Sequence, residues 1–218
     1  MEPLKITIRL KTPMVDPGAL LHLDGLLGAL RVEQAKVLQG ENINPRDHHY
    51  DIPVERHSTE SGQWVFKASA FRATMEAQSS LWMQTGRLSI PQAADHRAEG
   101  YLKLRGNKPN IAGGPFKTSI YRFPILWAEL TAYCVGDLQG VRDLLARCKQ
   151  IGPRRGAGFG QISEIVVEQV AHKECNWSYR AMPDECSGLV PGHVLAVGAL
   201  RAPYWDKTMH CKVLVPTE

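Results

Sequence analysis

The feature that most constrains this chain is a glycine- and arginine-rich run at 151–161, Ile-Gly-Pro-Arg-Arg-Gly-Ala-Gly-Phe-Gly-Gln. Glycine has no Cβ, so the backbone can turn through positive φ and approach another surface closely. Arginine offers forked donors that match a phosphate group, and an aromatic ring beside them offers a stacking face. The run therefore predicts a loop that contacts a nucleic-acid backbone. The alternative is an ordinary turn whose arginines face water.

The elements on either side of this loop exclude a nucleotide-cofactor site. Apolar residues recur at helical spacing through 138–148, after Asp137 as a helix N-cap. The β-branched run 162–170 predicts a strand. Dinucleotide-binding loops and P-loops have the reverse order, strand then helix. In addition, Gln161 stands where the dinucleotide pattern needs glycine, and no Gly-Lys-Ser/Thr occurs. We expect no cofactor.

Composition is typical of one domain, or of one domain with an elaboration. The chain has 218 residues, a net charge of +4 and a sequence pI near 8.8, which permits nucleic-acid binding without requiring it. No apolar run is long enough to cross a bilayer, and the start lacks the apolar core of a signal peptide. The five cysteines contain no Cys-x-x-Cys pair. We therefore expect a cytoplasmic protein with free thiols and no membrane partner.

Periodicity predicts an α+β fold whose core order, one extra strand aside, is the ferredoxin-like, RRM-like order βαββαβ. Strands are predicted at 4–10, 52–56, 63–70, 122–135 and 162–170, and helices at 23–38, 71–83 and 138–148. The segment 42–50 is predicted to be a loop. Residues 1–170 would form the core domain, with a long insertion at about 86–119. Residues 171–218 would form a β-rich extension packed on the same domain, with strand-like pieces at 194–200 and 212–215. Sheets of this class bind RNA, although the usual aromatic RRM signature is absent.

Two motifs carry a resemblance to a known family. His22-Leu23-Asp24-Gly25-Leu26-Leu27-Gly28-Ala29-Leu30 resembles the first-helix motif of the repeat-associated RAMP proteins of CRISPR systems, and 152–160 resembles their glycine-rich loop. Arg201-Ala202-Pro203-Tyr204-Trp205 adds to the likeness. Length and the single loop look most like the Cas-five-like subunit of a type IV effector complex.

The resemblance implies a non-catalytic subunit of an antiviral ribonucleoprotein complex that caps the 5′ handle of the guide RNA (crRNA). Its partners would be a Cas-seven-like backbone subunit and the large subunit. The implied RNA contacts lie on the glycine-rich loop, at the first helix and on a thumb-like insertion: Arg154, Arg155, Gly156, Gly158, Phe159, Gly160, His22, Lys103, Arg105, Lys108 and Lys117. The alternative for Phe159 is to anchor the loop in the core.

Histidines leave a catalytic alternative open. Some relatives of this kind cleave precursor RNA without a metal, using a general base that activates the 2′-hydroxyl. His22, His48 and His49 are the candidates, because imidazole titrates near neutral pH. A metal site from His172, Cys175, Cys186 and His193 is not expected, because the spacings are loose. A protein-interaction module with the same core is the third alternative.

Overall fold

The computed structural model describes residues 1–74, 78–86, 90–100 and 119–217. It is a mixed α/β structure with several antiparallel sheets and few helices. Contacts divide the chain into two compact units, one made of Met1–Gln78 with Leu126–Glu218 and the other of Ser79–Ile125. The predicted insertion at 86–119 falls within the second unit. Each unit is described by itself.

The first unit is built on a four-stranded antiparallel sheet in the order β5-β8-β1-β9. Its strands are β1 (Glu2–Leu10), β5 (Arg72–Ala73), β8 (Glu129–Gly136) and β9 (Ile162–Gln169). Ile6 of β1 lies opposite Ala132 on one side and Val167 on the other. Alternation of apolar and polar residues along β1 places one set of side chains on each face. The strands predicted at 4–10 and 162–170 are confirmed.

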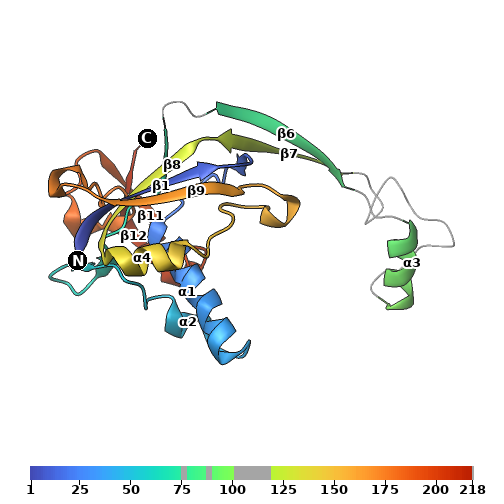
Figure 1. Ribbon diagram of the computed structural model, residues 1–218, viewed down its shortest axis with the longest axis horizontal. Coiled ribbons are helices and arrows are strands. Elements are labelled where there is room, and N and C mark those ends of the chain that lie inside the picture. The colour runs from blue at the N-terminus through green and yellow to red at the C-terminus, as the bar shows by residue number, and fades with distance from the viewer. Residues whose placement is uncertain (75–77, 87–89, 101–118, 218) are drawn as a thin grey trace. The chain divides into compact units, whose positions relative to one another are not determined.

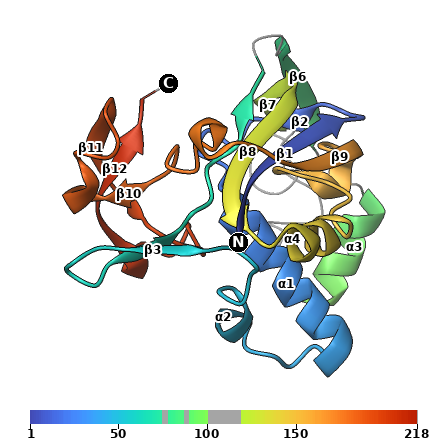
Figure 2. The same ribbon diagram turned by 60° about the vertical axis from the view of Figure 1, so that its left-hand side comes forward.

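Two helices, α1 (Leu23–Gln39) and α4 (Leu138–Leu145), cover one face of this sheet (Figure 1; Figure 2). The helix predicted at 23–38 is confirmed, and it ends at Gly40 with φ of 94°. The Asp137 carboxylate accepts a 2.6 Å hydrogen bond from the Gly140 amide, so the predicted N-cap of α4 is confirmed. The core between helices and sheet includes fully buried aliphatic side chains of β1, α1 and α4: Leu4, Ile6, Ile8, Leu23, Leu27 and Val141.

A second apolar cluster joins the C-terminal segment to a hairpin. The hairpin is β3 (Arg56–Ser58) with β4 (Trp64–Phe66), and the C-terminal sheet has the order β10-β12-β11. Its strands are β10 (Met182–Pro183), β11 (His193–Ala199) and β12 (His210–Pro216). Val65, Met182 and Val213 are buried together between hairpin and sheet. In Figure 2 these strands form a group on the left, beside the main sheet.

Three predicted elements are wrong. Instead of a helix at 71–83, the structure has β5 and then β6 (Gln78–Gly86), because this stretch pairs with strands that lie far along the chain. The loop at 42–50 contains a short helix, α2 (Pro45–His48), whose N-cap is Asn44. The single strand at 122–135 is two strands, β7 (Ser119–Trp127) and β8, with Ala128 between them.

The remaining elements are short or belong to the second unit. In that unit, β6 neighbours β7, and α3 (Ile90–Ala98) lies between them in sequence. β2 (Met14–Val15) follows β1 along the chain. Single turns of 3-10 helix are η2 (Arg155–Ala157), η3 (His172–Glu174), η4 (Asp184–Cys186) and η5 (Lys207–Met209). Among the described residues, no helix has the length and apolar character needed to span a membrane.

The packing of α1 on the sheet gives a direct test of this core. Leu27 is fully buried, whereas Leu38 on the same helix is 75% exposed. Leu27→Ala leaves a cavity and should lower the free energy of unfolding by about 2–5 kcal/mol. Leu38→Ala should change it by about 0.5 kcal/mol or less. Urea denaturation of both variants measures the difference, and equal effects would contradict the position of α1.

Candidate nucleic-acid interface

The glycine-rich loop connects α4 to β9, and its base is held by hydrogen bonds to the chain that follows β1 (Figure 1, orange turn). The Ile151 amide donates to the Gly160 carbonyl at 2.8 Å, which closes the loop on itself. The Gly160 amide donates to Pro13 O at 2.8 Å. The Thr12 hydroxyl donates to Gly158 O and accepts from the Gln161 amide. The base of the loop is therefore fixed to the core.

Two glycines in this base are required by close packing. Gly160 has φ of 66°, and a Cβ there would lie 1.8 Å from Ile151 O. Gly152 has φ of 83°, and a Cβ would lie 2.4 Å from the Cγ of Met14. A non-glycine residue would meet both the left-handed backbone strain and a collision at these positions. The glycine pattern is thus explained first by how the loop closes.

The tip of the loop is exposed and carries both arginines. Arg154 adopts a left-handed conformation with φ of 56°, and Arg155 opens the 3-10 turn η2. The Ala157 amide donates to Arg154 O, and the Gln150 side-chain amide donates to Arg155 O at 3.0 Å. Arg154, Arg155 and Gly156 are all exposed. A compact turn therefore presents two guanidinium groups at the surface.

The remaining loop residues that were predicted to contact RNA are three glycines and Phe159. Gly158 and Gly160 are among the predicted RNA contacts, and their amides donate to Arg155 O and Pro13 O. These two amides therefore already have partners in the chain, and the contact of both residues with RNA stays a prediction. Phe159 is buried, which supports the anchoring role that was its alternative. Around Gly156, a Cβ would meet no heavy atom within 4 Å, so this glycine leaves open space at the tip.

Two further exposed cations directly precede the loop in sequence, and a third lies on the chain after β1, where the Lys11 amide donates to Gln161 O. They are Lys11, Arg147 and Lys149. In the described parts of the chain, Lys11, Arg147, Lys149 and the loop residue Arg155 form no ion pair. Positive charge without a carboxylate partner attracts phosphate more strongly than charge already neutralised. The loop region is therefore suited to a polyanion.

On the sheet face opposite the helices, unlike at the loop, the cations form ion pairs with carboxylates. Arg9 forms ion pairs with Glu129 and Glu164, its neighbours on the two adjacent strands, and Lys5 pairs with Glu168. The two Arg9 contacts raise its pKa, mainly through its hydrogen bond to Glu129. The cations of this face are thus matched by carboxylates. This face is a poorer surface for RNA than the loop.

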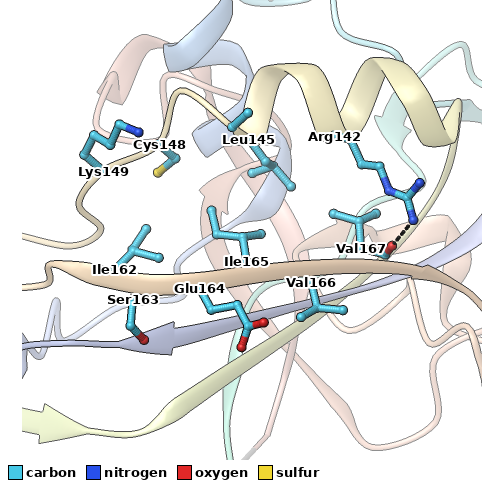
Figure 3. Close-up of a pocket in the computed structure, with 11 residues that line it drawn as sticks. Arg142, Leu145, Cys148, Lys149, Ile162, Ser163, Glu164, Ile165, Val166 and Val167 are labelled. Atoms are coloured by element: carbon cyan, nitrogen blue, oxygen red, sulfur yellow. Dashed lines mark hydrogen bonds between the residues drawn. The ribbon is translucent and has the colours of Figure 1, made fainter.

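A groove of about 500 Å³ lies between α4 and β9 and reaches the start of the loop (Figure 3). Figure 3 shows Ile162, Ile165 and Val167 pointing from β9 toward the helix, and Ser163 and Glu164 pointing away. The guanidinium of Arg142 donates to Val167 O at 2.7 Å and so satisfies one carbonyl of this edge strand. Lys149 lies at the end next to the loop. The groove is therefore continuous with the charged region of the loop through Lys149.

His22 was predicted to contact RNA or to act as a general base, and its burial argues against both roles. It is 6% exposed, and its ring stacks on Tyr204 with centroids 4.1 Å apart. Burial lowers its pKa to about 3, and the positive charge of Arg180 acts in the same direction. A neutral ring without access to solvent has a structural role, as the residue before α1.

Tyr204 and His22 belong to a buried polar network that is centred on Arg180. Arg180 is fully buried and donates to Asp24 Oδ2 at 3.3 Å, to the Tyr204 hydroxyl at 2.8 Å and to four backbone carbonyls, those of Phe66, Ala68, Ala181 and Leu200. The Tyr204 hydroxyl in turn donates to the Asp24 carboxylate at 2.8 Å. A buried charge is tolerated only when it is paired and fully hydrogen-bonded. The network therefore fixes the C-terminal segment against α1 and β4.

The motifs noted at 22–30 and 201–205 meet in this network. Gly25 allows the Tyr204 ring to approach, since a Cβ there would lie 3.2 Å from it. Gly28 lies against the backbone of α2, with a would-be Cβ 2.8 Å from His49 O. Arg201 stacks over the Trp64 ring at 4.3 Å, whereas Trp205 is 80% exposed. Arg180 itself was missed from sequence, because no local pattern marks a buried arginine.

The other histidines belong to no metal-binding cluster in the described residues. His48 and His49 lie at the end of α2 and are half-buried. Burial lowers the pKa of His49. Where the structure is described, no group of three or more histidine, cysteine or acidic side chains is arranged to hold a metal ion. Cys186 lies 3.8 Å from His57, and all five cysteines are free thiols.

The predicted contacts of the insertion, Lys103, Arg105, Lys108 and Lys117, lie outside the described residues. The described part of the second unit carries exposed apolar side chains on both of its strands. Leu81 and Met83 of β6 and Ile120 of β7 are the clearest examples. These strands thus present apolar side chains at the surface, together with the exposed Arg122 of β7.

Comparison with known proteins identifies the class. The family model of CRISPR type IV associated protein Csf3 matches residues 2–216, which is nearly the whole chain. The chain therefore belongs to this family and is a type IV CRISPR-associated protein. No curated protein matches it.

The loop closure is tested by two matched glycine substitutions. Gly160→Ala introduces the collision with Ile151 O at positive φ, and we expect a loss of at least about 2 kcal/mol of stability. Gly156→Ala has open space and an ordinary φ, so stability should stay within about 1 kcal/mol of the parent. Urea denaturation compares them. A Gly160→Ala variant as stable as the parent would contradict the closed loop.

The buried imidazole predicts a pH dependence. Because the pKa of His22 is lowered to about 3 in the folded chain, the unfolded chain, with an ordinary value near 6.5, binds more protons between these limits. The stability contributed by the neutral ring is fully present above pH 6.5. It is lost at up to about 1.4 kcal/mol per pH unit as the pH falls toward 3.

His22→Phe keeps a stacking ring but does not titrate. Between pH 6.5 and 4, its free energy of unfolding should fall less steeply than that of the parent. The difference in slope should reach about 1.4 kcal/mol per pH unit. Urea titrations at several pH values measure this, and parallel curves for variant and parent would show that His22 is not buried as a neutral ring.

Proposed function

We propose that this chain is a non-catalytic RNA-binding subunit of a type IV CRISPR effector complex that caps the 5′ handle of the guide RNA. The observation that carries the proposal is the exposed pair Arg154 and Arg155 at the tip of a loop whose base is fixed to the core. Membership of the type IV family supports an RNA-guided context. The complex would act in antiviral defence.

The architecture we propose is the ferredoxin-like core of RAMP proteins, in the Cas-five-like form. Supporting this is the strand order β5-β8-β1-β9, in which the first strand is central and the last strand of the core, β9, lies at an edge. The two helices α1 and α4 follow β1 and β8 along the chain and cover one face. This agrees with a βαββαβ order. The insertion within the second unit would serve as the thumb.

The physical basis of RNA binding is charge held in a fixed place. Arginine donates bidentately to phosphate, and a turn that is already ordered loses little entropy on binding. The paired carboxylates of the open sheet face make that face unattractive to a polyanion. The guide strand would therefore lie over the loop tip, with Lys11, Arg147 and Lys149 extending the contact.

A non-catalytic role agrees with the state of the candidate general base, His22, which is buried and has a strongly lowered pKa. A general base must reach the proton that it removes. We further propose a cytoplasmic subunit whose partners are the crRNA, a Cas-seven-like backbone subunit and the large subunit. No cofactor is required by this function.

The proposal is tested by removing the two loop charges. Arg154→Ala with Arg155→Ala should weaken binding of the 5′ handle RNA by about 10–100-fold at physiological salt, because each charge-assisted hydrogen bond contributes ~1.5–3 kcal/mol, of which water recovers part. The slope of log affinity against log salt should fall by about 1.4, since each single-strand phosphate contact contributes roughly 0.7. Fluorescence anisotropy with labelled RNA measures both.

A matched control removes the same number of positive charges from the sheet face. Lys5→Ala with Arg9→Ala deletes cations that carboxylates already neutralise, so RNA affinity should stay within about twofold. Equal loss in both double variants would mean that net charge and not the loop binds RNA. Cleavage of repeat RNA in the presence of EDTA, lost on changing His48 or His49, would contradict the non-catalytic role.

A further inference from the structure

Strand β11 of the C-terminal sheet is an open apolar edge. In the order β10-β12-β11 it lies at the edge, and β12 is its one neighbour among the described strands. Its seven residues, His-Val-Leu-Ala-Val-Gly-Ala, include no carboxylate, lysine or arginine. Val194 is 48% exposed, Leu195 62% and Val197 76%. Both the backbone of the outer side and these aliphatic side chains are therefore accessible.

This edge lacks the features that normally protect an edge strand. Proteins block such strands with charged side chains, proline or a β-bulge that twists the edge away. Here the register with β12 runs without a shift from His193 opposite Pro216 to Ala199 opposite His210. A regular and uncharged edge with exposed aliphatic side chains is a template for another strand.

We propose that β11 receives an extended segment of another protein subunit of the effector complex as an added strand. The inference rests on membership of the type IV family and is independent of the proposed guide-RNA contact. The backbone groups of β11 would pair with that segment, and Leu195 and Val197 would pack against its alternate aliphatic side chains.

A positive charge beside the exposed aliphatic side chains of β11 defines the chemistry of the partner further. Lys212 lies directly opposite Val197 in the register, so the two side chains share a face, and Lys212 is exposed. A complementary segment therefore carries a carboxylate next to its apolar residues. RNA does not fit this surface, because a phosphate backbone needs several cations and the strand itself has none.

A second copy of this chain is a poorer occupant. A stable interface between two proteins uses about 20–30 residues a side and about 800 Å² per partner, whereas β11 offers seven residues. So small an edge holds a partner only when other contacts of the same assembly bring the two together. That condition is met between different subunits of one complex.

The test places a lysine on the edge. Val197→Lys introduces the charge with which natural edge strands are protected, and its exposure means that the isolated chain should fold with an unchanged melting temperature. Val37→Lys on α1 is the matched control, because Val37 is 75% exposed but lies on a helix. Each tagged variant is co-expressed with the other protein subunits of its system and purified, and the co-purifying subunits are quantified.

We expect Val197→Lys to retain at most about a tenth of the protein subunits retained by the parent, a loss that corresponds to about 1.4 kcal/mol. Val37→Lys should retain them fully, and amide hydrogen exchange of β11 should slow on assembly. RNA affinity of the isolated Val197→Lys chain should equal that of the parent, which separates this result from a failure of the guide-RNA proposal. Normal assembly of Val197→Lys would overturn the inference. So would a dimer of the isolated parent, seen by light scattering and abolished by the same substitution.

Discussion

The buried guanidinium of Arg180 is the interaction on which the arrangement of the first unit depends. It is fully buried and joins Asp24 of α1, the backbone of β4 and the Tyr204 hydroxyl. Breaking a buried ion pair by removing one partner costs about 3–5 kcal/mol, because the other charge remains uncompensated. The C-terminal segment is therefore part of the fold. The same contacts explain why His22 is stacked and neutral rather than available for chemistry.

With the first helix and the C-terminal segment fixed, the surface that we propose for RNA binding is the exposed tip of the loop. The base of the loop is closed by Gly160 and anchored by Phe159, while the tip exposes Arg154 and Arg155. Rigid closure and exposed charge are complementary, because an ordered loop presents its donors without a further entropic cost on binding. A second surface, the β11 edge, has the opposite chemistry and suits a protein. In our proposals, these two surfaces would bind RNA and protein at separate places on one small subunit.

The parts of the fold that depend on local chemistry could be predicted from sequence. Alternation in β1, the periodicity of α1 and the Asp137 cap all involve residues close together in the chain. The segment 71–83 could not be predicted, because strand pairing with distant segments overrode its helical pattern. The Arg180 network could not be predicted either, since Asp24 and Arg180 are 156 positions apart.

The candidate site, like the fold, could be predicted only in part from the sequence. Glycine and arginine content pointed to the loop and to its exposed tip, but not to which amides the fold would use internally. Gly158 and Gly160 donate to carbonyls of the chain, and only three-dimensional closure reveals this. The roles of Lys103, Arg105, Lys108 and Lys117 stay predictions.

The most direct measurement of the central claim is photo-crosslinking of the assembled complex, with a photoreactive nucleotide in the 5′ handle of the guide and mass spectrometry of the attached peptides. The account predicts attachment within 149–157, around the exposed tip. Attachment to the sheet-face residues Lys5 and Arg9, with none at the loop, would contradict it.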